Sequence, residues 1–118
     1  MDTNALVPVA SKTEVFDTGY ADRDGNQLEY LVTIQALAQM GNAGRPLAWR
    51  VYGQQIRAGR PWGRTSVPRV VFSMREALSM ARTIFEKHRR YIERNHARAQ
   101  LRAAAAEEDL DRLAGGLR

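Results

Sequence analysis

Apolar and polar side chains alternate most regularly in the second quarter of the chain. A period of two is typical of a β-strand with one buried face, and here it is carried by Leu28, Tyr30, Val32, Ile34 and Ala36. The preceding segment Asp22–Asn26 combines Asp, Gly and Asn, which favour tight turns. Apolar residues are also present on the N-terminal side of that turn, in residues 13–21. We therefore predict a hairpin with strands at 13–21 and 28–39.

Two further strands are predicted in the middle of the chain. The third covers residues 47–52 and continues after a bulge at Gly53. Residues 60–64 contain Gly and Pro and are predicted to form a loop. Residues 65–72 are predicted to form a fourth strand, which Pro68 restricts to the edge of a sheet because proline cannot donate a ladder hydrogen bond.

The start of a long helix at Met74 is the sharpest local signal. Ser73 and Glu76 form a capping box, in which the Ser73 hydroxyl accepts from the Glu76 N–H and the Glu76 carboxylate reaches back to the Ser73 N–H. No Gly or Pro interrupts the chain from Met74 to Ala114. Helical spacing is shown by the apolar residues Met74, Ala77, Leu78, Ala81, Ile84, Phe85, Tyr91 and Ile92.

The apolar stripe of this helix needs a surface to pack on, and the predicted strands provide one. We predict an α+β fold, in which a small antiparallel β-sheet of three to four strands packs on one long C-terminal α-helix. The predicted core contacts join helix residues Leu78, Ile84 and Phe85 to sheet residues Val32, Ile34, Trp49 and Val51.

Three segments are expected along the chain. Residues 1–12 have no clear period and are predicted to be a flexible N-terminal arm. Residues 13–98 form the α+β domain. Residues 99–118 are rich in alanine and acidic residues and are predicted to be a helical or frayed C-terminal tail.

Positive charge is concentrated in residues 45–102, here called the basic block. The whole chain has a net charge of +5, but the basic block holds fourteen Arg and Lys against three Glu and carries +11. The segments before and after it are acidic, at −4 and −2. Sixteen of the eighteen cations are Arg, which suits bidentate contacts to phosphate or carboxylate. A GC-rich genome would produce the same bias.

The composition argues against several classes of protein. The chain has no cysteine, which excludes disulfides, thiolate catalysis and cysteine-based zinc sites. His88 and His96 have no carboxylate at ligand spacing, and no nucleophile elbow, phosphate loop or paired-carboxylate motif is present. We therefore expect no catalytic residue, no metal, no cofactor and no enzymatic activity.

The sequence shows neither a signal peptide nor a run of ~20 apolar residues, so we expect a cytoplasmic protein without membrane contact.

Residues 57–64 place three Arg residues around Trp62. Guanidinium groups neutralise phosphates and an indole stacks on a base, so this chemistry suits nucleic acid. The alternative is that Trp62 fills the core and the Arg residues are merely solvated.

Arg50 and Tyr52 are expected on the open face of the sheet, where single-strand binders carry such residues, although ordinary surface composition would also explain them. The predicted nucleic-acid-binding residues are Arg50, Tyr52, Arg57, Arg60, Trp62, Arg64 and Arg69.

The tripeptide Trp62-Gly63-Arg64 resembles the signature of the WGR domain. The passage from Phe72 to Ala77, with Phe85-Glu86-Lys87 further on, is similar to the strand-to-helix passage of that family. The resemblance covers about residues 26–91 and implies a small antiparallel sheet on a helix with a basic, nucleic-acid-binding surface. The spacing departs from the family, because residues 65–68 follow the tripeptide directly where WGR domains carry further glycines and a longer run. No catalytic or binding residue is assigned from the resemblance to the WGR domain.

Two functions fit these observations. The first is a small, dimeric, basic protein that binds DNA or RNA, of the kind that mobile elements and phages encode. The second is a protein-interaction module, such as a phage- or plasmid-type inhibitor or assembly subunit, whose basic block meets an acidic protein partner. Direct phosphate contacts predict a steep dependence of affinity on salt, which separates the two.

Overall fold

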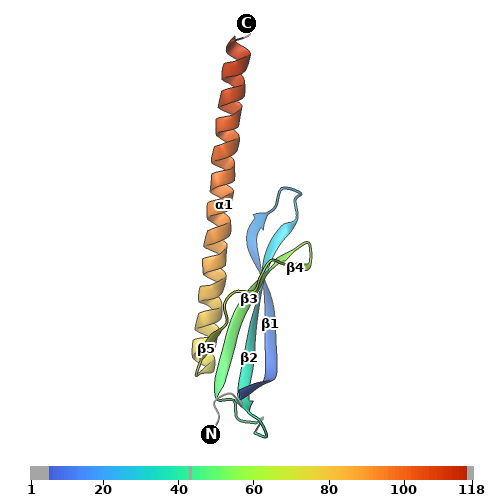
Figure 1. Cartoon of the computed structure of the whole chain (residues 1–118), viewed down its shortest axis with the longest axis vertical. Coiled ribbons are helices and arrows are strands. Elements are labelled where there is room, and N and C mark those ends of the chain that lie inside the picture. Colours follow the sequence, from blue (N-terminus) through green and yellow to red (C-terminus); the bar gives the residue numbers. More distant parts are fainter. Residues whose placement is uncertain (1–5, 43, 117–118) are drawn as a thin grey trace.

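The computed structural model describes residues 6–42 and 44–116, in which a twisted antiparallel sheet lies beside one long helix (Figure 1). The strand order is β1-β2-β3-β4, and β5 pairs with β3 as well. This arrangement confirms the predicted α+β class. The elements are β1 (Leu6–Ala21), β2 (Gln27–Gln39), β3 (Ala48–Arg57), β4 (Arg60–Trp62), β5 (Arg69–Val71) and α1 (Met74–Gly116).

The turn between β1 and β2 forms where the sequence predicted it. The Asp22 carboxylate accepts hydrogen bonds from the backbone N–H groups of Asp24, at 2.9 Å, and Asn26, at 2.8 Å. Gly25 has a φ of +81°, a conformation that glycine adopts without steric cost. The Asx-type bonds of Asp22 thus close the hairpin locally.

Strand β1 begins earlier than predicted. The expected flexible arm at 1–12 is wrong for residues 6–12, which pair with β2; residues 1–5 lie outside the described residues. The ladder shifts register between Pro8 and Ala10. This part of β1 lies at the sheet edge, contains a proline beside an irregularity, and has only exposed or half-exposed side chains without a clear period. The sequence pattern therefore did not predict it.

The middle strands also differ from their predicted bounds. Strand β3 pairs with β2 from Ala48 to Arg57 without a register shift, so the predicted bulge at Gly53 is wrong. The predicted loop at 60–64 contains the short strand β4, and the predicted strand at 65–72 is a strand only within β5. Between them, Ser66 donates its N–H to the Gly53 carbonyl at 2.7 Å, and its hydroxyl accepts from the Gly53 N–H at 2.8 Å.

Helix α1 begins at Met74, as predicted. The Ser73 hydroxyl accepts from the Glu76 N–H at 3.0 Å. The Glu76 carboxylate accepts from the N–H of Phe72, also at 3.0 Å, rather than from Ser73, so the second bond of the predicted capping box is displaced by one residue. The cap therefore ties the helix to the end of β5.

The molecule is elongated because the helix is longer than the sheet it packs on. Its extents are 80 × 22 × 22 Å, and a 43-residue helix is ~64 Å long. The predicted tail continues α1 and extends beyond the sheet (Figure 1). Its large apolar side chains are exposed at Leu101, Leu110 and Leu113.

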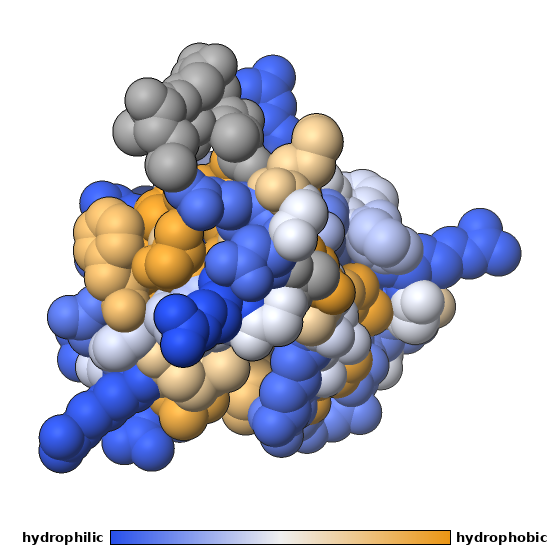
Figure 2. Space-filling view, turned by 90° about the horizontal axis from the view of Figure 1, so that it is seen from below, coloured by the Kyte–Doolittle hydropathy of each residue, from blue (hydrophilic) through white to orange (hydrophobic). Residues whose placement is uncertain are grey.

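The core lies between α1 and the facing sides of β2 and β3. Ile84 and Phe85 are partly buried against it, as predicted, but Leu78 is 55% exposed, so its predicted burial is wrong. Ala77 takes the buried position instead. Apolar side chains also remain exposed among hydrophilic ones in the view from below (Figure 2). The buried centre consists of Tyr30, Val32, Ile34, Val51 and Ala77.

Candidate nucleic-acid interface

Tyr30, near the start of β2, links the sheet to the helix. Its ring stacks on the His88 imidazole of α1 with a centroid distance of 4.2 Å and an interplanar angle of 22°. The same ring lies against Gly53, where an added Cβ would come within 2.1 Å of the Tyr30 Cε2 atom. The absence of a side chain at Gly53 therefore leaves the space that the ring occupies.

Burial changes the titration of both stacked side chains. It raises the pKa of Tyr30, against the opposing effect of a hydrogen bond with the Ser66 side chain. It lowers the pKa of His88, because the charged imidazolium would lose hydration. The His88 Nε2 atom is buried without a hydrogen-bond partner in the described residues. The neutral form of the His88 ring is therefore favoured in the folded protein.

We expect the stability of the protein to fall on acidification because of His88. Its pKa in the folded chain lies below that of the unfolded chain, about 6.5. Between the two values the unfolded chain binds more protons, so the free energy of unfolding increases with pH in that window and is fully regained above about 6.5. Urea unfolding at about pH 7.5 and about pH 5.5 measures this change.

Two variants separate this effect from general acid destabilisation. His88→Phe keeps a ring on Tyr30 but does not titrate, so it should lose less stability than the wild type between the two pH values. His96→Gln is the control: it removes the exposed histidine whose ring lies 5.2 Å from that of Tyr20, outside the stacked pair, and it should retain the loss that His88 causes. Equal losses in the wild type and in His88→Phe would contradict the prediction.

A groove between α1 and the segment before β5 opens beside the stacked rings. It has a volume of about 670 Å³, and Tyr30, Ile84 and His88 lie along it. We call it the helix-side groove. Its cations are Arg69 from β5 and two residues of α1, and Tyr91, also on α1, is 53% exposed. The basic residues that line it are Arg69, Lys87 and Arg94.

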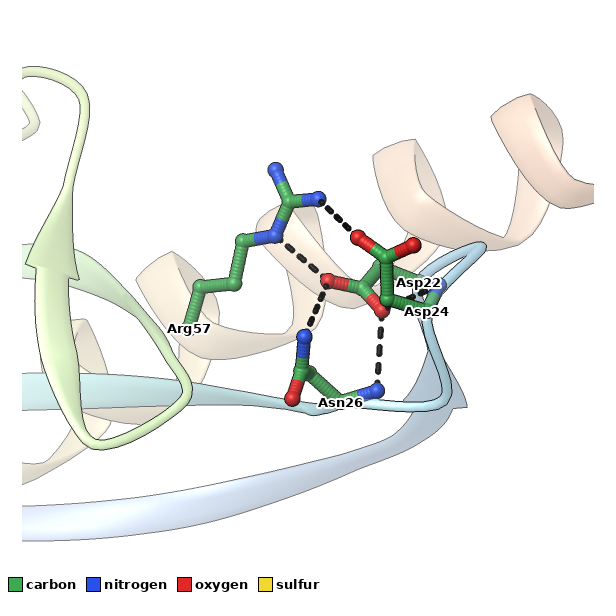
Figure 3. A network of polar contacts seen from close by, with 4 residues as sticks. All are labelled: Asp22, Asp24, Asn26 and Arg57. Carbon is green, nitrogen blue, oxygen red and sulfur yellow. Dashed lines mark hydrogen bonds and ion pairs between the residues drawn. The ribbon is translucent and has the colours of Figure 1, made fainter.

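The β3–β4 hairpin contains the predicted aromatic residue, Trp62. Arg57 in this hairpin contacts both the β1–β2 turn and the Trp62 ring. Arg57 donates from Nε to the Asp22 carboxylate, and its Nη2 atom lies 3.9 Å from the carboxylate of Asp24 (Figure 3). Partial burial by itself raises the pKa of Asp22, but hydrogen bonds from Asn26 and Arg57 outweigh it and lower the pKa. Arg57 therefore joins this hairpin to the β1–β2 turn, and its charge is compensated.

The guanidinium of Arg57 also covers one face of Trp62. The distance from Cζ to the ring centroid is 4.6 Å, which is a cation–π contact. Trp62 is 53% exposed, so the alternative in which it fills the core is wrong. Arg60 and Arg64 are exposed beside it. The hairpin therefore presents an indole held in place on one side and accessible to solvent.

The predicted site residues do not converge on one face of the sheet. Residues that pair across antiparallel strands share a face. Trp62 pairs with Gln55, which pairs with Tyr30, so the indole lies on the side of α1. Arg69 pairs with Val51 and lies on that side too. The opposite, open face carries Arg50 and Tyr52, both half-buried.

Apart from Arg69, the residues that line the helix-side groove were not among the predicted site residues. Lys87, Tyr91 and Arg94 follow each other at the i, i+4 and i+7 positions of α1 and therefore share one helix face. That spacing is visible in the sequence. The missing information was which face of the helix would lie beside β5.

Most of the cations of the basic block form no ion pair with a carboxylate of the described residues. Of its fourteen Arg and Lys residues, Arg57 alone forms an ion pair with a carboxylate of the described residues. Three Arg–Glu pairs lie at i,i+4 spacing on α1, a spacing at which ion pairs can form. None of them is within 4.0 Å in the described chain, namely Arg82–Glu86, Glu86–Arg90 and Arg89–Glu93. The block thus remains strongly electropositive in the folded protein.

Comparisons with known proteins return no match: no family model, no curated protein and no solved structure is similar to the chain. The WGR resemblance accordingly stays a prediction. In residues 6–42 and 44–116, no group of three or more His, Asp or Glu side chains is placed to hold a metal ion. Within the same residues, no helix combines the length and apolar character needed to cross a bilayer.

Proposed function

We propose that the chain binds nucleic acid through the side of the sheet on which α1 packs. The observation that carries this proposal is the uncompensated charge of the basic block together with two exposed aromatic rings, Trp62 and Tyr91. Arg and Lys side chains neutralise phosphates and release counterions. The rings supply stacking platforms for unpaired bases, so single strands are the favoured ligand.

The helix-side groove and the hairpin form one path for a strand. Phosphates contact Arg69, Lys87 and Arg94 in the groove, while Arg60 and Arg64 extend the positive surface at the hairpin. Trp62 is preorganised by Arg57, which lowers the entropic cost of stacking on it. The open face, with Arg50 and Tyr52, is not part of this path.

Trp62 fluorescence provides a direct measurement of binding. The chain has a second tryptophan, Trp49, so a Trp49→Phe variant leaves Trp62 as the single reporter. A single-stranded oligonucleotide is expected to quench it, and log affinity should fall linearly with log salt, by about 0.7 per phosphate contact. A duplex of the same sequence should bind more weakly.

Matched triple variants locate the contacts. Replacing the three groove cations with Gln should reduce the salt slope by about 2, since each contributes about 0.7. A control removes the same charge at exposed positions away from the groove and should change the slope less. The two variants are Arg69→Gln/Lys87→Gln/Arg94→Gln and, as control, Arg23→Gln/Arg45→Gln/Arg112→Gln.

Two outcomes would overturn the proposal. Equal losses in the two triple variants would show that binding depends on net charge alone and not on the groove. Failure of any single- or double-stranded oligonucleotide to bind at ~50 mM salt would remove nucleic acid as the ligand. That second result would favour the alternative function, in which the basic block meets an acidic protein.

A further inference from the structure

The outer edge of β1 is unpaired in the described chain. Strand β1 is sixteen residues long, and β2 pairs with its other edge. A long exposed edge is a template for a further strand, and natural proteins interrupt such edges with bulges. Register shifts occur between Pro8 and Ala10 and between Asp17 and Ala21. The ladder is regular between them, so residues 10–17 are the part of the edge that is left open.

The charges in this window are self-complementary. Lys12 and Glu14 lie on the same face of β1, on either side of Thr13 along the strand. When two identical strands pair antiparallel about a two-fold axis at Thr13, each Lys12 lies opposite Glu14 of the second copy. An axis at Lys12 or at Glu14 would instead place like charges opposite each other, which is destabilising. Charge complementarity therefore selects the register centred on Thr13.

A second groove lies beside the same edge. It has a volume of about 600 Å³ and separates β1 from α1. Phe16, Ile34 and Phe85 contribute apolar surface to it, and the exposed side chain of Leu78 lines it from the helix. Lys12 and Glu14 line it too and are exposed. A β1 strand of a second copy, added at this edge, would cover the open side of the groove.

We propose that two copies of the chain associate through β1, antiparallel about Thr13, to form one continuous sheet. Paired residues on the two β1 strands share a face, so both α1 helices lie on the same side of that sheet. The interface is isologous, because the same window of each copy contacts the other. Both helix-side grooves then face in one direction. This inference stands independently of the ligand proposed above.

Cysteine cross-linking tests the register, because the chain has no cysteine of its own. At the two-fold axis the two Thr13 Cα atoms would be ~4.5–5.5 Å apart, within the range of a disulfide. Thr13→Cys should therefore form a disulfide-linked dimer on mild oxidation. Ser11→Cys is the control: it would lie opposite Val15 of the second copy, ~13 Å from the other Ser11 position, and should not cross-link.

Charge exchange tests the same pairing without oxidation. Lys12→Glu and Glu14→Lys each put two like-charged pairs in the interface and should raise the dimer dissociation constant about tenfold. The double exchange Lys12→Glu/Glu14→Lys restores the opposite-charge pairs and should restore the affinity. Sedimentation equilibrium over a range of protein concentrations measures these constants, and circular dichroism confirms that each variant is folded.

Three results would overturn the proposal. The first is a wild-type chain that is monomeric throughout the concentration range. The second is cross-linking of both cysteine variants or of neither. The third is a dimer that ignores the charge exchanges and disappears when residues 103–118 are deleted, which would place the interface on the C-terminal half of α1.

Discussion

Gly53→Ala is expected to destabilise the protein by about 2–3 kcal/mol, although the substitution adds a single methyl group. The new Cβ would lie 2.1 Å from Cε2 of Tyr30 and 2.4 Å from its Cζ and hydroxyl oxygen. The ring cannot move away freely, because His88 stacks on it. Either the ring leaves its rotamer or β3 moves away from β2. Urea unfolding monitored by circular dichroism measures the loss.

Two further variants isolate the cause. Gly44→Ala is the matched control, because a Cβ there meets no atom within 4 Å, and its stability should be close to that of the wild type. In a Tyr30→Ala background, Gly53→Ala should cost little, since the ring that it strikes is gone. A double-mutant cycle of these two changes would then show strong coupling. Equal costs of Gly53→Ala with and without the ring would contradict the explanation.

Gly53 also shows where local sequence patterns stop being informative. A glycine inside a strand commonly marks a bulge, which is why the sequence predicted an interruption of β3. The strand is continuous because the missing side chain makes room for Tyr30, twenty-three positions earlier in the chain. Such a fit depends on the cross-strand register, which no local pattern contains. The β1–β2 turn, by contrast, depends on neighbouring residues and was predicted.

The candidate site was predictable in composition but not in arrangement. The sequence identified an Arg-rich loop with Trp62, and the structure places that indole at the surface. It could not show that Asp22, thirty-five residues away, compensates Arg57. Nor could it place Arg50 on the opposite face from Arg69, since that depends on how β5 pairs with β3. The chemistry of each side chain can be read from the sequence, whereas which side chains share a face of the sheet depends on the fold.

The contrast between Phe85 and Leu78 has the same origin. Both belong to the apolar stripe of α1, seven residues apart, and the sequence predicted that both are buried. In the structure Phe85 packs on the core and its ring lies 5.0 Å from that of Phe16, while Leu78 is 55% exposed. Periodicity predicts the face of a helix but not the width of the sheet that covers it.

Phe85→Ala should therefore cost about 3 kcal/mol, the low end for phenylalanine truncation, because the ring is only partly buried. The loss combines the cavity left under α1 with the aromatic contact to Phe16. Leu78→Ala, two turns earlier, should stay within about 0.5 kcal/mol of the wild type. Both are measured by urea unfolding at one protein concentration, because association would shift apparent stability. Equal losses in the two variants would mean that α1 packs on the sheet with a different face.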